Sequence, residues 1–169
     1  MVVNPLLKCL KIKALAIAVL IALNCNGLGS ECKRWVLELR AVSLNPLIIW
    51  IPVRIGEAIT LQFIHSWDKM PVKETLIIAK DGNMILSEAQ FTKLGAGYDA
   101  PPVSGKYTLK DGKIIITDMN IKLKKIPLRI GTVAQHQLII KGRALTLAEF
   151  FGKGNRIDIQ LKPVHISDD

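Results

Sequence analysis

Residues 58–65 (AITLQFIH) and residues 72–80 (VKETLIIAK) are joined through Asp81-Gly82-Asn83 to residues 84–93 (MILSEAQFTK), and this stretch decides the fold. In its first segment every second residue from Ile59 to Phe63 is apolar, whereas Thr60 and Gln62 fall on the other face. Strict alternation over several residues predicts a half-buried β-strand. Glycine and asparagine accept the positive φ of a tight turn, so residues 81–83 predict a hairpin.

The same pattern continues on both sides of this hairpin. In residues 35–40 (WVLELR) the alternation places Leu37 and Leu39 inside and Glu38 outside. Residues 47–53 (LIIWIPV) are apolar on both faces, but Pro46 and Pro52 confine them to an edge or an irregular stretch. Further strands are expected at about residues 106–109, 113–117, 121–123, 127–130, 136–141 and 156–162, with a hairpin turn at Asp111-Gly112.

The sequence thus predicts an all-β fold, an antiparallel β-sandwich or partly open barrel of about nine to eleven short strands. Residues 145–151 (LTLAEFF) are expected to hold a single helical turn capped by Thr146. We expect one β domain over residues 31–165 and a loose tail over residues 166–169.

The N-terminal residues have the pattern of an export signal. Lys8, Lys11 and Lys13 precede an uninterrupted apolar run at residues 14–23. A helix needs about 20 apolar residues to span a bilayer, whereas a run of about 7 to 15 after a basic start is typical of a secretory signal. Residues 1–30 are therefore predicted to be a signal peptide, cut near Gly29 or Ser30, or a short anchor helix that contacts the membrane through residues 14–23. Lipidation at Cys25 is the alternative.

This reading predicts a location in the periplasm or on the outer face of the cytoplasmic membrane. The chain has 169 residues and a net charge of +9. Its basic residues are spread out and do not interleave with aromatic residues, which argues against nucleic acid. Beyond residue 30 there is a single cysteine, Cys32, so no disulfide is expected within the domain.

The densest polar cluster is residues 65–74 (HSWDKMPVKE). Adjacent strand residues point to opposite faces, so His65 is poorly placed to activate Ser66 as a nucleophile. We expect residues 66–71 to form a loop, with His65 opposite Glu74 as a cross-strand pair. That pair is either a polar anchor of a binding site or a structural pair that fixes the hairpin.

No cofactor or metal site is predicted. His136 and His165 show no ligand spacing. Gly95-Ala96-Gly97 lacks the strand–glycine–helix context of a phosphate loop and is expected to be a turn.

Several of these segments resemble a known bacterial family. The string from Gly56 to Ser66, then Pro71-Val72-Lys73-Glu74, then Phe91 with Gly95-Ala96-Gly97, is similar to the family called domain of unknown function 1850. Leu128-Arg129-Ile130-Gly131 and His136 extend the resemblance over most of residues 35–150. After the glycine turn, residues 98–100 (YDA) replace the leucine and proline usual in the family.

The resemblance implies a role beside TAXI-type TRAP solute transporters, since members are often encoded next to their membrane components. It also implies a binding site at His65, Ser66, Glu74, Gly95, Ala96 and Gly97. The expected partner is a TRAP membrane subunit or a small solute, without catalysis. A small envelope hydrolase that uses His65 and Glu74 with water, and a purely structural envelope protein, are the alternatives.

Overall fold

The computed structural model describes residues 34–67, 69–92 and 104–164. The predicted signal segment and the predicted tail lie outside these residues, so both stay predictions. Among the described residues no helix is long and apolar enough to cross a membrane.

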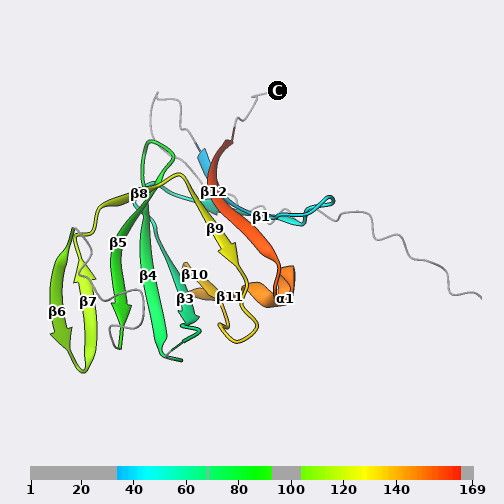
Figure 1. The fold of residues 1–169 in the computed structure, drawn as a ribbon. Helices are drawn as coiled ribbons and strands as arrows, with labels where there is room; N and C mark the ends of the chain where they lie inside the picture. The colour runs from blue at the N-terminus through cyan, green and yellow to red at the C-terminus, as the bar shows by residue number, and fades with distance from the viewer. Residues whose placement is uncertain (1–33, 68, 93–103, 165–169) are drawn as a thin grey trace, which may run out of the picture.

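The described residues form twelve strands in two antiparallel sheets, which confirms the predicted all-β sandwich (Figure 1). The smaller sheet has the strand order β2-β1-β12-β9, and the larger has the order β11-β10-β3-β4-β5-β7-β6 with β8 also paired to β5. The bounds are β1 Arg34–Ala41, β2 Ile48–Val53, β3 Ala58–Ile64, β4 Pro71–Ile78, β5 Met84–Phe91, β6 Lys106–Lys110, β7 Lys113–Thr117, β8 Ile121–Leu123, β9 Lys125–Arg129, β10 Gln137–Ile140, β11 Arg143–Thr146 and β12 Arg156–Val164.

The strand missing from the sequence prediction is β11. Lys141 and Gly142 both have positive φ, 50° and 72°, which is the backbone of a two-residue type I′ turn. They close a hairpin in which Ile140 lies opposite Arg143. Lysine is not a usual residue for the first position of such a turn, so the sequence did not reveal this hairpin. The structure therefore has one strand more than the predicted upper limit of eleven.

Prolines mark both edges of the smaller sheet. β2 contains Pro52 and is an edge strand, as predicted, and β9 contains Pro127 and is the opposite edge. Proline cannot donate to a ladder, so it is tolerated where one side of the strand is unpaired. The predicted turns at Asp81-Gly82-Asn83 and Asp111-Gly112 both connect paired strands.

The main core lies between the two sheets. It joins Leu37 and Leu39 of β1 and Ile157 and Ile159 of β12 to the inner face of the larger sheet and to helix α1 (Leu147–Phe151). Thr146 precedes α1 as predicted, but its side chain makes no capping hydrogen bond, so the predicted side-chain cap is wrong.

Glu38 departs from the simple alternation of β1. Its side chain is on the outer face of the smaller sheet but is only 3% exposed. Trp50 Nε1 donates to it at 3.0 Å, Gln160 Nε2 at 2.8 Å, and Arg40 donates twice at 3.3 Å. Burial alone would raise the pKa of Glu38, but these donors outweigh burial and hold the pKa below its ordinary value. The outer face is therefore tied across β2, β1 and β12 by one carboxylate.

Candidate functional site

The two sheets differ in width, so part of the larger sheet extends beyond the smaller one. Seven strands lie side by side in the larger sheet and four in the smaller. At about 4.8 Å between strands, the larger is about 29 Å wide and the smaller about 14 Å. In Figure 1, β7 and β6 lie far from β1 and β12. The smaller sheet cannot cover this side of the larger one.

A second apolar cluster occupies the part of the larger sheet beyond the smaller one, and its buried members are themselves only 1–6% exposed. Its buried members come from β4, β5, β7 and the segment after β7, and none comes from the smaller sheet; they are Val72, Ala89, Phe91, Ile116 and Met119, with Phe63, Leu86 and Ile114 packed against them. We call this the overhang face.

The overhang face continues onto the edge strand β6. Tyr107 lies opposite Ile116, and Leu109 lies opposite Ile114. Residues directly opposite in an antiparallel pair share a face, so both side chains extend the apolar surface. Tyr107 is 42% exposed and Leu109 is 76% exposed. The outermost strand of the overhang therefore offers apolar side chains to solvent.

Glu74 is the acidic residue on this surface. It lies opposite Leu61 of β3 and Ala89 of β5, both of which are buried. Its side chain thus points to the inner face, between the main core and the second cluster. Among the described residues it has no hydrogen bond or ion pair. Burial without a partner raises the pKa of Glu74.

A bulge interrupts the β4–β5 ladder immediately after this carboxylate. The register shifts between Thr75 and Leu76. β-Bulges re-aim side chains and are common beside functional sites. The backbone irregularity thus adjoins the one inner-face carboxylate of β4.

The predicted pairing of His65 with Glu74 is wrong. Leu61, not His65, lies opposite Glu74, and Ile64 lies opposite Pro71. His65 is four residues beyond the partner of Glu74, about 13 Å along the strand. The observed loop, residues 65–70, has the same length as the predicted loop, residues 66–71, but begins and ends one residue earlier. Proline is tolerated as the first residue of a strand, so Pro71 begins β4.

Backbone hydrogen bonds close this loop. The His65 N–H donates to the Met70 carbonyl at 2.8 Å, and the Lys69 N–H donates to the His65 carbonyl at 3.1 Å. Lys69 has a positive φ of 57°. Ser66 is exposed in the loop. His65 and Ser66 therefore lie at the end of β3, beside the overhang face and not next to Glu74.

The glycine turn Gly95-Ala96-Gly97 lies outside the described residues. Phe91, where β5 ends, pairs with Val72 and Ile114 and belongs to the second cluster. The turn follows four residues later in the chain. Its contribution to a site with Glu74 stays a prediction.

His136 is a buried inner residue that the sequence analysis did not place in the site. It is 6% exposed, and its ring centroid is 5.3 Å from that of Phe63. Its Nδ1 accepts from the Gly131 N–H at 3.3 Å, which leaves the ring proton on Nε2. Burial lowers the pKa of His136. The family resemblance at residues 128–136 was the signal that could have found it.

The described residues contain no group of three histidine, cysteine, aspartate or glutamate side chains able to hold a metal ion. The family model for a domain of unknown function, DUF1850, matches residues 59–147. The chain belongs to the DUF1850 family. No curated protein and no solved structure matches it.

The DUF1850 match follows the larger sheet. It begins at the second residue of β3 and ends just after β11, so it contains nearly all of the larger sheet, together with β9. β1, β2 and β12 lie outside it. Glu74, His136 and the overhang face are therefore features of the DUF1850 part of the chain.

The arrangement in this DUF1850 domain can bind a partner. Leu61, not His65, lies opposite Glu74, so the pairing on which the hydrolase alternative rests is not formed. An apolar surface around a single acceptor can bury an apolar partner and fix its orientation by one polar contact.

Proposed function

We propose that this chain is a non-catalytic binding domain, outside the cytoplasmic membrane, that assists a TAXI-type TRAP uptake system. The observation that carries the binding role is the unpartnered carboxylate of Glu74 on the apolar overhang face. The resemblance to the DUF1850 family suggests the transporter, and the basic and apolar N-terminal pattern suggests the location.

Of the two partners considered, the overhang face favours the membrane subunit over a small solute. Small-molecule sites enclose most of the ligand in a concave pocket. Tyr107 and Leu109 are instead exposed on an edge strand whose five residues are all exposed. Such an edge suits a protein, because it offers unpaired backbone groups together with an apolar face.

The proposed contact has two parts. Leu109 and Tyr107, at the exposed edge of the overhang face, bury apolar side chains of the subunit, and Glu74 accepts a hydrogen bond from a donor or cation on it. Burial raises the pKa of Glu74 because it disfavours the charged carboxylate. A cationic group of the partner would favour the charged form, so a cationic partner gains affinity.

The test is co-purification of the tagged full-length chain with the transporter membrane subunit from solubilised membranes of the native host. Leu109→Glu is expected to abolish capture. Thr108→Glu is the matched control, because Thr108 is on the same strand but the opposite face. Glu74→Lys is expected to weaken capture as well.

Equal capture by the Leu109 and Thr108 variants would refute the role of the overhang face. Failure of the unaltered chain to capture any TRAP subunit, with or without crosslinking, would refute the transporter role. Loss of a bound small solute in the Glu74 variant, with capture intact, would point to the solute instead.

A further inference from the structure

Four exposed apolar side chains gather at the end of the smaller sheet, away from the overhang face. Val42, Leu44 and Leu47 lie in the β1–β2 loop, and Phe150 lies on α1. Their exposed fractions are 54%, 101%, 39% and 46%. We call these four residues the apolar lip. Leu44 gains nothing from the fold of the chain itself.

Backbone bonds hold the lip at both ends of the loop. The Ala41 N–H donates to the Leu47 carbonyl, and the Val42 N–H donates to the Arg156 carbonyl, both at 2.9 Å. The loop is thus closed at its base and tied to β12. Its apolar side chains are presented on a fixed support, which reduces the entropy lost on binding.

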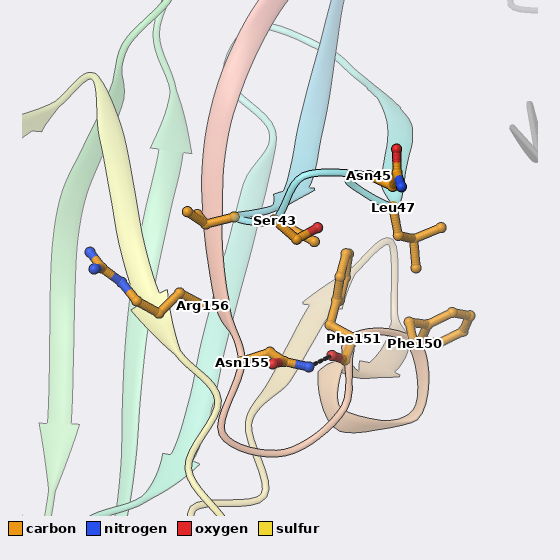
Figure 2. A pocket seen from close by; sticks show the side chains of 9 residues that line it. Ser43, Asn45, Leu47, Phe150, Phe151, Asn155 and Arg156 are labelled. Carbon is orange, nitrogen blue, oxygen red and sulfur yellow. Dashed lines mark hydrogen bonds between the residues drawn. The ribbon is translucent and has the colours of Figure 1, made fainter. Parts of the chain in front are cut away.

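A cavity of about 210 Å³ lies beneath the lip. Figure 2 shows Leu47 and Phe150 on the same side of it, with Asn155 donating to the Phe151 carbonyl at 2.7 Å. Ser43 and Asn45 add polar groups to its wall. The lip therefore combines apolar side chains with polar groups of the same loop.

Two arginines lie on the outer face of the smaller sheet, and one of them, Arg156, also lines the cavity beneath the lip. Figure 2 shows the Arg156 side chain on the other side of β12 from Leu47 and Phe150. Arg156 of β12 lies directly opposite Arg129 of β9, and both are exposed. Neither makes an ion pair or side-chain hydrogen bond within the described parts of the chain. Like charges directly opposite one another are unfavourable for folding, and an anion bound beside the pair would offset this repulsion. The acidic Glu149 of α1 has Lys153 close by in sequence.

We propose that the apolar lip and the two arginines dock this domain on an anionic phospholipid surface. Leucine and phenylalanine side chains enter the acyl boundary, and the two guanidinium groups bind headgroup phosphates. Charge complementarity favours this occupant over a neutral or apolar protein surface. The lip residues lie outside the DUF1850 match, and the contact is separate from the overhang face and from residues 14–23.

The test uses the full chain. Because residues 14–23 could bind vesicles by themselves, a fluorescent label in the lip is needed to report on the lip alone. Cys9, Cys25 and Cys32 are replaced by serine, and Asn45→Cys in the lip loop carries an environment-sensitive fluorophore. Lys110→Cys, at the end of β6, carries the same label as a positional control. Vesicles are phosphatidylcholine alone or an equimolar mixture with phosphatidylglycerol.

On the mixed vesicles the label at position 45 should shift to the blue and be quenched by acyl-chain spin labels, while the label at position 110 should not. Leu44→Ser should weaken insertion roughly tenfold, and the matched exposed leucine change Leu109→Ser should not alter it. Each of Arg129→Gln and Arg156→Gln should raise the lipid concentration for half-insertion about fivefold.

Three results would overturn the inference. The label at position 45 could stay in water while the chain sediments with vesicles. Insertion of the label could be equal in vesicles of pure phosphatidylcholine. Insertion could also need native membranes and fail on vesicles of lipid alone. The last would indicate a protein partner. Each of these leaves the co-purification test of the proposed function unaffected, because that test depends on Leu109 and Glu74.

Discussion

Replacing Glu74 with leucine should make the domain more stable. The position is on the inner face between buried Leu61 and Ala89, and its carboxylate has no partner among the described residues. A leucine there would add apolar contact and remove a charge that burial disfavours. Full burial of a leucine is worth about 1.5–3 kcal/mol. Because the site is only partly buried, we expect a gain of about 1–2 kcal/mol.

The pH dependence of this gain has a definite sign. Burial raises the pKa of Glu74, so the folded state binds this proton more readily than the unfolded chain. The favourable contribution is present below the ordinary carboxyl pKa and is lost as pH rises through the raised pKa. The advantage of the leucine variant should therefore be smallest in acid and grow toward neutral pH.

Urea unfolding at several pH values is the assay, with Glu88→Leu as the matched control. Glu88 is a carboxylate of the neighbouring strand that accepts from Gln90 Nε2 at 2.6 Å. A gain of 1–2 kcal/mol corresponds to a midpoint shift of about 1 M urea. If Glu74→Leu is no more stable than Glu88→Leu, or is less stable than the parent, Glu74 has a structural role and the binding proposal loses its main support.

Three further changes test the fold. Glu38→Ala should lower the free energy of unfolding by about 2 kcal/mol at neutral pH, because the buried donors around position 38 lose their acceptor. Since the pKa of Glu38 is depressed, the parent should lose its advantage over the variant as pH falls through that pKa. Urea unfolding at neutral and acid pH measures both effects. In thermal unfolding, Gly82→Ala should destabilise the domain by at least about 1 kcal/mol more than Gly56→Ala. Both glycines have a φ of 81°, but a Cβ at position 82 would lie 2.4 Å from the Trp35 ring, whereas one at position 56 would meet nothing. Equal losses of stability would contradict this packing argument. His136→Gln should reduce the fall in the free energy of unfolding between about pH 7.5 and 5.5. Burial lowers the pKa of His136, so the stability that the neutral ring contributes is lost as pH falls. The same dependence on pH in the parent and the variant would show that other groups cause the fall.

The fold was largely predictable because it is governed by local patterns. Alternation from Ile59 to Phe63 identified the inner face of β3, and Pro52 identified an edge. What failed was decided by contacts across strands. Alternation places Glu38 on the outer face and therefore predicts that it is exposed. Its burial depends instead on Trp50, twelve residues away, and on the distant Gln160.

The site was predictable only in part. Glu74 was selected from the polar cluster at residues 65–74 and through the family resemblance, but its assigned neighbour was wrong because the sequence does not fix the register of the hairpin. In the structure Ile64 lies opposite Pro71, so the residue opposite Glu74 is Leu61, four residues before His65. The overhang face was missed because a strand sequence does not state what covers it. Tyr107 and Leu109 alternate like any half-buried pair, and their exposure follows from the unequal width of the two sheets.

That inequality connects the family match to the proposed function. A larger sheet of seven strands abreast extends beyond one of four, and among the described residues its outermost strand leaves Tyr107 and Leu109 exposed, an apolar surface that a partner can cover. The DUF1850 match retains nearly all of the larger sheet and lacks β1, β2 and β12. We therefore expect the overhang face to be the surface that family members use in common. The apolar lip lies outside the match, so its proposed membrane contact is expected to vary among members while Glu74 and its apolar surroundings stay in place.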